Sequence, residues 1–198
     1  MLIVFDLEST ITEDEFWDTF PETKELLAQG LTGEQDYAKA LRKRFKMVEG
    51  MPKKEFESHA RNLTLRDDAD EFFKWAHEKK IRLAIVSSGF DFFTKLVAEE
   101  LKVKHWKANS VVYKDSKVVG AKEPILAAEG KKQFVENLQN EYKIKHKYTV
   151  VVGDGANDLK MMELARFKVG MCAKPVVASK VDYNITSFRE LKELIEKL

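Results

Sequence analysis

Four short apolar runs, each followed at once by polar residues, constrain the fold of this chain more than any other feature. The runs cover residues 1–5, 81–86, 148–152 and, more weakly, 167–171. An unbroken apolar run of this length is typical of a strand that is buried on both faces. Helical spacing of apolar residues occupies the intervals at residues 70–80, 92–101, 131–142, 159–165 and 187–197. The alternation predicts an α/β fold, in which a Rossmann-like parallel sheet is flanked by helices.

Two stretches interrupt this alternation. The first is strand-free and has helical patterns at residues 14–20, 21–28, 34–48 and 53–63. We interpret residues 13–68 as a small helical cap domain inserted into an α/β core of residues 1–12 and 69–198. The second stretch, residues 103–125, has two short apolar segments on either side of a polar turn at 114–117. This pattern predicts a β-hairpin flap.

Composition excludes several classes of protein. The chain has 198 residues, of which 44% are hydrophobic, so it can bury a core without disulfides or metal. Its 34 Lys and Arg residues against 33 Asp and Glu residues give no global basic surface, and we expect no nucleic-acid partner. The single cysteine, Cys172, excludes a disulfide framework and is expected to be a buried thiol. No apolar run approaches the roughly 20 residues of a membrane span, so we expect a cytoplasmic protein without membrane contact.

Acidic residues follow the first and third apolar runs. Asp6 and Glu8 end the first run, and Asp154 and Asp158 flank a glycine-rich turn after the third. Ligands of parallel α/β sheets bind outside the carboxyl ends of the strands, where these acids are expected to meet. One carboxylate can attack phosphorus while a second transfers protons, and Mg²⁺ prefers carboxylate oxygens. Alternatively, acids at strand ends are solvated loop residues, and Asn157 or Asp158 caps a helix.

Groups suited to binding an anion follow the second run and precede the third. Ser87, Ser88 and Gly89 offer a hydroxyl and backbone N–H groups at a predicted strand-to-helix turn. Lys131 begins a predicted helix and could neutralise a phosphoryl oxygen. Taken singly, Ser-Gly turns and exposed lysines are common.

Taken together, these motifs resemble those of the haloacid dehalogenase superfamily, and specifically its phosphoserine phosphatase branch. The resemblance rests on Asp-Leu-Glu-Ser-Thr from Asp6, Ser-Ser-Gly-Phe-Asp from Ser87, Lys131, and Gly-Asp-Gly-Ala-Asn-Asp ending at Asp158. These motifs occur in that order and cover essentially the whole chain. The resemblance implies a magnesium-dependent phosphomonoesterase that works through an aspartyl-phosphate.

The resemblance also implies a role for each acid. Asp6 would be the nucleophile and a Mg²⁺ ligand. Glu8 would be the general acid and base, with its backbone carbonyl on the metal. Asp154 would be the remaining protein ligand of Mg²⁺, and Asp158 would support the metal or its waters.

The phosphate site is implied in the same way. Ser87, the N–H of Ser88 and Gly89 would hold phosphate oxygens, while Lys131 balances their charge. Asn157 would lie close by.

Two residues of the predicted cap point to a phosphorylated amino acid. In the phosphoserine branch a cap glutamate nine residues past the nucleophile meets the substrate amine, and that position is Glu15 here. A cap arginine in a Leu-Arg-Lys-Arg run binds the substrate carboxylate, and that position is Arg44. Arginine suits this task because its planar fork makes two parallel hydrogen bonds to a carboxylate. Otherwise Arg44 belongs to a solvated basic face. We therefore expect a small phosphomonoester such as phosphoserine as the substrate, and the oligomeric state is left open.

Glu8 departs from the pattern of the branch, which usually has aspartate at this position. Bifunctional phosphoserine phosphatases that also act as homoserine phosphotransferases share the Asp-Leu-Glu sequence. The acceptor of the phosphoryl group is therefore water, or alternatively homoserine or another small alcohol, and a different phosphorylated metabolite is a further alternative. A receiver domain also accepts phosphate on an aspartate, but it lacks a cap of this length. A degraded enzyme that only binds phosphorylated metabolites is the remaining alternative.

Overall fold

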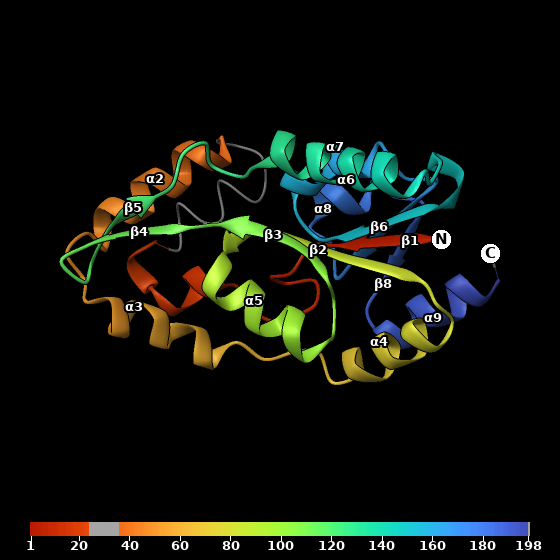
Figure 1. The fold of residues 1–198 in the computed structure, drawn as a ribbon, viewed down its shortest axis with the longest axis horizontal. Coiled ribbons are helices and arrows are strands. Elements are labelled where there is room, and N and C mark those ends of the chain that lie inside the picture. The colour runs from red at the N-terminus through yellow and green to blue at the C-terminus, as the bar shows by residue number, and fades with distance from the viewer. Residues whose placement is uncertain (24–35, 198) are drawn as a thin grey trace.

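The computed structural model describes residues 1–23 and 36–197, and its centre is a parallel sheet (Figure 1). The sheet has the order β3-β2-β1-β6-β7-β8, and every neighbouring pair of strands is parallel. Its strands, in chain order, are β1 Leu2–Phe5, β2 Arg82–Phe90, β3 His105–Asn109, β6 Thr149–Gly153, β7 Phe167–Met171 and β8 Tyr183–Ile185. The four predicted runs are the four central strands. The predicted fold class is therefore confirmed.

Helices cover both faces of the sheet. Alternate residues of β1 enter two separate cores: Ile3 and Phe5 enter one, Leu2 and Val4 the other. The first core is closed by α4 Ala69–Glu78, α5 Asp91–Glu100 and α9 Phe188–Glu196. The second is closed by α6 Ala128–Tyr142, α7 Leu159–Met162 and α8 Pro175–Ala178. Burial on both faces is why these strands read as continuous apolar runs.

The predicted helical insertion lies at one end of the molecule (Figure 1). Its described elements are the 3₁₀ turns η1 Phe16–Thr19 and η2 Pro21–Thr23, the helices α2 Tyr37–Met47 and α3 Lys53–Ser58, and the 3₁₀ turn η3 His59–Asn62. The side chain of Asp36 accepts a hydrogen bond from the Lys39 N–H at 2.9 Å, which fixes the start of α2 at Tyr37. The end of the helix predicted at 21–28 and the start of that at 34–48 lie outside the described residues.

The predicted flap is a two-stranded antiparallel hairpin of β4 Val111–Lys114 and β5 Lys117–Ala121. It is hydrogen-bonded to the insertion along its backbone. Gly50 N–H donates to Val118 at 2.9 Å, Val118 N–H donates to Met51 at 2.9 Å, and Lys53 N–H donates to Ser116 at 2.8 Å. The hairpin is thus attached to residues of the cap, while the boundaries set above at residues 12 and 68 stay predictions.

One local prediction is wrong. Residues 87–89 were expected to form a strand-to-helix turn, but β2 continues through them to Phe90 and α5 begins at Asp91. The register against β3 shifts between Val86 and Phe90, because Phe90 pairs again with Asn109 after an irregular segment. The proposed anion-binding groups therefore lie in the irregular end of a strand.

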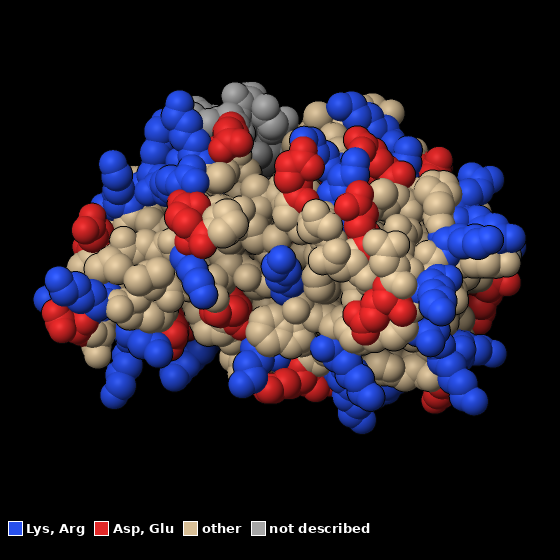
Figure 2. Space-filling model, turned by 45° about the horizontal axis from the view of Figure 1, so that its top comes forward, with Lys and Arg blue, Asp and Glu red and all other residues tan. Residues whose placement is uncertain are grey.

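The surface carries charges of both signs, interspersed over the face seen in Figure 2. In the described ranges, no helix is both long enough and apolar enough to cross a membrane.

Candidate active site

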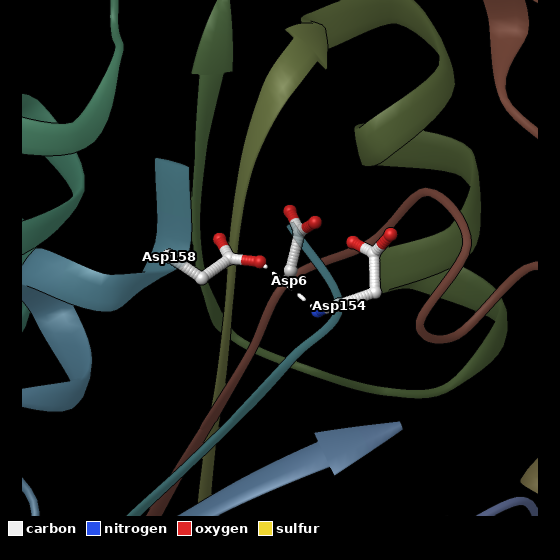
Figure 3. A group of neighbouring side chains, drawn as sticks. All are labelled: Asp6, Asp154 and Asp158. Carbon is white, nitrogen blue, oxygen red and sulfur yellow. Dashed lines mark hydrogen bonds between the residues drawn. The ribbon is translucent and has the colours of Figure 1, made fainter. Parts of the chain in front are cut away.

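Three buried aspartates meet at the carboxyl ends of β1 and β6 (Figure 3). β1 and β6 are neighbours, and the Asp6 N–H donates to the Val152 carbonyl at 2.9 Å, so Asp6 leaves β1 beside the end of β6. Asp154 directly follows β6, and Asp158 ends the 3₁₀ turn η5 Ala156–Asp158. One carboxylate oxygen from each aspartate lies within 4.8 Å of the other two. The adjacency of the strands, more than any local feature, produces this cluster.

Lys131 is the cation buried among these acids. Its Nζ donates to Asp6 Oδ1 at 2.6 Å and to Asp158 Oδ1 at 2.7 Å, and its side chain is fully buried near the start of α6. Burial alone would lower the pKa of Lys131, but the charges of Asp158 and Asp6 outweigh it and raise that pKa. Burial and the charge of Asp158 raise the pKa of Asp6, against the effect of Lys131. The ammonium therefore stays charged and holds one oxygen of Asp6.

Asp158 and Asp154 differ in what their carboxylates contact. Asp158 Oδ2 accepts from the N–H groups of Asp154 and Gly155 at 3.1 and 3.2 Å, so both of its oxygens are used within the protein. Asp154 Oδ2 is bound by Lys174, but Asp154 Oδ1 is buried and has no hydrogen-bond partner among the described residues. A buried, unsatisfied carboxylate oxygen is costly unless something binds it. The available oxygens of the cluster therefore belong to Asp154 and Asp6.

Lys174 was not predicted as a site residue. It follows β7, and its ammonium contacts Asp154 and lies 3.7 Å from Glu15 Oε1. Burial raises the pKa of Asp154 to about 7, with a further contribution from the charge of Glu15 that Lys174 opposes. The signal in the sequence that could have identified Lys174 is the polar stretch after the fourth apolar run, because ligands of a parallel sheet bind outside the carboxyl ends of its strands.

Glu8 lies against the irregular end of β2. Its Oε2 accepts from the Phe16 N–H at 2.8 Å, while Oε1 is buried without a partner in the described part of the chain. A Cβ on Gly89 would lie 1.7 Å from Glu8 Oε1, so only glycine leaves room for this carboxyl group. Burial, aided by the charge of Asp6, raises the pKa of Glu8 to about 7. A carboxyl group with this pKa can both give and take a proton near neutral pH.

Two charged residues of the cap reach the same region. Glu15 Oε1 accepts from the Ser9 hydroxyl at 3.0 Å, and burial together with the charge of Glu8 raises the pKa of Glu15 to about 7. Arg44 is 0% exposed, and its three guanidinium nitrogens lack hydrogen-bond partners within residues 1–23 and 36–197. Its Cζ lies 5.2 Å from the ring centroid of Trp17 and 5.3 Å from that of Tyr37. The charge of Arg44 also acts on Glu8, so the guanidinium lies near this carboxyl group.

The predicted phosphate-binding residues form a hydrogen-bonded loop. Ser87 Oγ accepts from the Gly89 N–H at 2.8 Å, and Asn157 Nδ2 donates to Ser88 Oγ at 3.2 Å. Asn109 Nδ2 donates to the Ser88 carbonyl at 2.8 Å and was not predicted from the sequence. The loop is thus fixed by residues from β3 and from the turn after β6. Because phosphate binding is the role proposed for them, we call residues 87–89, at the irregular end of β2, the phosphate loop below.

Packed aromatic rings surround the cap side of the pocket. Phe16, Trp17 and Phe90 lie 5.2–5.8 Å apart between ring centroids, and each also packs against Phe56. A cavity of about 290 Å³ lies between α2 and α6, with Tyr37 and Asn157 in its wall. A larger groove of about 710 Å³ lies between the insertion and α5, lined by residues such as Leu63 and Leu96. The aspartates are not part of its lining, so this groove is not where the acids meet.

The structure brings the predicted site residues of the core together in one place. Contacts join Lys131 to two of the aspartates, Glu8 to the phosphate loop, and Asn157 to the same loop. Cys172, in contrast, was expected to be buried and is exposed. It follows β7 with φ of 46°, a turn conformation that turns the residue away from the core.

Comparison with known protein families gives one match that spans most of the chain. The family described as haloacid dehalogenase-like hydrolase matches residues 3–163. Among curated proteins, the phosphoserine phosphatase of Methanocaldococcus jannaschii is 30% identical over 98% of this chain and 96% of its own length. The phosphoserine phosphatase of Lactococcus lactis is 28% identical over 100% of this chain and 96% of its own.

Two solved structures are similar over their full length. A phospho-aspartyl intermediate analogue of phosphoserine phosphatase superposes with a TM-score of 0.92 at 30% identity, covering 100% of this chain and 98% of that one. A substrate-bound phosphoserine phosphatase complex gives a TM-score of 0.92 at 29% identity, covering 100% and 97%.

Proposed function

Because the chain belongs to the haloacid dehalogenase-like hydrolases, we propose that it hydrolyses phosphoserine to serine and phosphate through an aspartyl-phosphate on Asp6. One observation carries this choice of substrate. A fully buried Arg44, whose guanidinium has no partner among the described residues, and a buried Glu15 both act electrostatically on Glu8, which in turn is affected by the charge of Asp6. Such an arrangement offers a cation for a carboxylate, an anion for an ammonium group, and acids for phosphoryl chemistry.

Asp6 is the proposed nucleophile. Lys131 holds Asp6 Oδ1, so Asp6 Oδ2 is the oxygen that attacks phosphorus. As the Oδ2–P bond forms, the bond from phosphorus to the serine oxygen breaks, and the leaving oxygen needs a proton. Lys131 also offsets the negative charge that the phosphoryl group brings into a buried site.

Glu8 is the proposed general acid and base. With a pKa of about 7 it carries a proton in part of the molecules at neutral pH and gives it to the serine oxygen. The ionised Glu8 then takes a proton from water as the water oxygen attacks the aspartyl-phosphate. This second step breaks the bond between Asp6 and phosphorus, releases phosphate and restores the protonated Glu8.

The acid cluster fits a divalent cation with oxygen ligands. Three carboxylates lie within reach of one point, and Asp154 Oδ1 is buried without a partner in the described residues. Asp6, Asp154 and the backbone carbonyl of Glu8 would hold Mg²⁺, and Asp158 would support it. When bound, the ion neutralises charge on the phosphoryl group and lowers the repulsion between phosphate and carboxylates.

Recognition of the substrate is divided between core and cap. Ser87, the Ser88 N–H and Gly89 would hold the phosphate oxygens, with Asn157 beside them. In the cap, Glu15 would bind the ammonium group and Arg44 the carboxylate, which its two parallel N–H groups match. This division means that the phosphate alone does not use the cap residues.

Phosphate release from L-phosphoserine in the presence of Mg²⁺ tests the proposal. Asp6→Asn is expected to abolish release, because the nucleophile is lost. Glu8→Asp is expected to retain or speed release, and Asp115→Asn, an exposed acid in the hairpin turn, serves as the control with unchanged activity. Undiminished release by Asp6→Asn would refute the mechanism. Adding homoserine and assaying phosphohomoserine separates hydrolysis from transfer.

A further inference from the structure

The first residue of α2 joins the cap to the phosphate loop. The Tyr37 hydroxyl donates a hydrogen bond of 3.2 Å to the Ser88 carbonyl, across 51 positions of sequence. This bond exists only when the cap helix is packed onto the core. Burial raises the pKa of the Tyr37 phenol, so the hydroxyl keeps its proton and can donate near neutral pH.

The carbonyl that Tyr37 contacts is already held firmly from the core side. Asn109 Nδ2 donates to the same oxygen at 2.8 Å, and Asn109 also exchanges hydrogen bonds with the backbone of Leu126 at 2.6 and 3.1 Å. A carbonyl oxygen has two lone pairs, and here one is used by the core and the other by the cap. The peptide between Ser88 and Gly89 is therefore fixed by both domains at once.

The ring of Tyr37 contacts the proposed carboxylate-binding residue. Arg44 lies seven residues further along α2, which places it two turns away on the same face of the helix. Its guanidinium carbon is 5.3 Å from the Tyr37 ring centroid, within the range of a cation–π contact. One side chain thus touches the phosphate loop through its hydroxyl and the arginine through its ring.

We propose that Tyr37 is a positioning residue that links the carboxylate subsite at Arg44 to the phosphate loop at Ser88. A ligand with both a carboxylate and a phosphoryl group uses both ends of this link and favours the packed cap. A ligand with only a phosphoryl group does not. Tyr37 then contributes to selectivity for phosphorylated amino acids over simple phosphate esters. The inference rests on the proposed function for the identity of the two subsites.

Tyr37→Phe removes the hydroxyl and keeps the ring, so it isolates the link. A neutral hydrogen bond of this kind corresponds to about a two- to tenfold change in an equilibrium. We expect KM for L-phosphoserine to rise about fivefold with kcat nearly unchanged, and kcat/KM for p-nitrophenyl phosphate to change less than twofold. Tyr37→Leu, which also removes the ring from Arg44, should raise the KM for phosphoserine further.

Tyr113→Phe is a matched control. It removes a hydroxyl that bonds Glu57 at 3.1 Å, between the hairpin and the cap helix α3 and away from the phosphate loop. Both kinetic constants should stay at their wild-type values in this variant. An equal fall in kcat/KM for both substrates in Tyr37→Phe, or an unchanged KM for phosphoserine, would overturn the inference.

A measurement without substrate separates this inference from the proposed function. In wild-type protein, amide hydrogen exchange reports opening of the phosphate loop and the start of α2. Tyr37→Phe should speed exchange in peptides that cover residues 37–41 and 87–90, and Tyr113→Phe should not. If wild-type protein fails to hydrolyse phosphoserine but this difference in exchange is present, the link stands and the substrate assignment falls. Equal exchange in Tyr37→Phe and wild type refutes the link itself.

Discussion

Replacing Arg44 with methionine is expected to stabilise the ligand-free protein while weakening its binding of phosphoserine. The guanidinium is 0% exposed, and its three nitrogens have no partner within the described ranges. A buried donor without a partner lowers the free energy of unfolding by about 1–3 kcal/mol, and a buried ion without a partner lowers it by several kcal/mol. Contacts with the rings of Trp17 and Tyr37 and the charge of Glu8 offset part of this cost. Methionine fills similar space without a charge, so we expect a net gain of about 2 kcal/mol in the free energy of unfolding.

The same substitution removes the proposed partner of the substrate carboxylate. Truncating one member of a buried, hydrogen-bonded charge pair costs about 2–5 kcal/mol. A loss of about 3 kcal/mol corresponds to about a 150-fold fall in kcat/KM, at 1.4 kcal/mol for each factor of ten. Arg44→Met should therefore raise the stability of the protein while it lowers kcat/KM for phosphoserine, as expected where a buried charge is kept for binding.

Thermal unfolding followed by circular dichroism, without Mg²⁺ or substrate, measures the first effect. For a chain of this size about 1 kcal/mol shifts Tm by about 2–4 °C, so Arg44→Met should raise Tm by about 4–8 °C. Arg42→Met is the control on the same helix, because Arg42 is exposed and, among the described residues, pairs with Glu123 at the surface. It should leave Tm and KM nearly unchanged. A lower Tm for Arg44→Met would show that the guanidinium supports the fold, and an unchanged KM for phosphoserine would remove its role in binding.

Two further predictions concern Glu8, the proposed general acid and base, and the acids proposed to lie around Mg²⁺. Gly89→Ala should lower kcat by about 100-fold, because the new Cβ displaces Glu8 Oε1. The double variant Gly89→Ala/Glu8→Asp has a shorter acid and should recover part of the lost kcat. Equal activity of the single and double variants would contradict this steric cause. Glu8, Glu15 and Asp154 have pKa values raised to about 7, so these groups stay protonated in the folded, metal-free protein at pH values where the unfolded chain releases the protons, near pH 4–5. The contribution of these three groups to the free energy of unfolding is fully present below about pH 4 and is lost as the pH rises through about 7. Melting curves in EDTA should show a Tm that falls as the pH rises from 5 to 8, and the increase in Tm on adding Mg²⁺ should grow over the same range. A Tm that rises with pH in EDTA would refute the predicted direction of the pH dependence.

The central strands were predictable because burial on both faces leaves continuous apolar runs. β3 and β8 were missed, and both are edge strands of the sheet. β3 is partly exposed and contains His105 and Lys107, while β8 has only three residues, two of them exposed. Edge strands bury less of their surface and so leave a weaker pattern in the sequence. The hairpin was found because a polar turn separates its two short apolar segments.

The part of the candidate site that lies at the ends of the strands was predictable from the sequence. The meeting of Asp6 and Asp154 follows from the rule that parallel strands present their carboxyl ends at one edge. Lys174 and Asn109 were not assigned a role, because each contacts the site only through the packing of residues distant in sequence. The link from Tyr37 to Ser88 depends on how the cap lies over the sheet, and no local pattern encodes that placement.

The buried charged groups around the aspartates lead us to expect that a complete phosphorylated amino acid binds better than phosphate alone. Among the described residues, the guanidinium of Arg44 and Asp154 Oδ1 have no hydrogen-bond partner, and Glu15, which lies near Lys174 and accepts from Ser9, is kept partly protonated by burial. These groups come from different elements, so no rearrangement within one helix or loop can satisfy all of them. Under the proposed roles, phosphoserine would bring a carboxylate to Arg44 and an ammonium group to Glu15, and Mg²⁺ would bring a cation to Asp154. A simple phosphate ester with Mg²⁺ would still leave the buried Arg44 without an anionic partner, which would disfavour the packed cap around it.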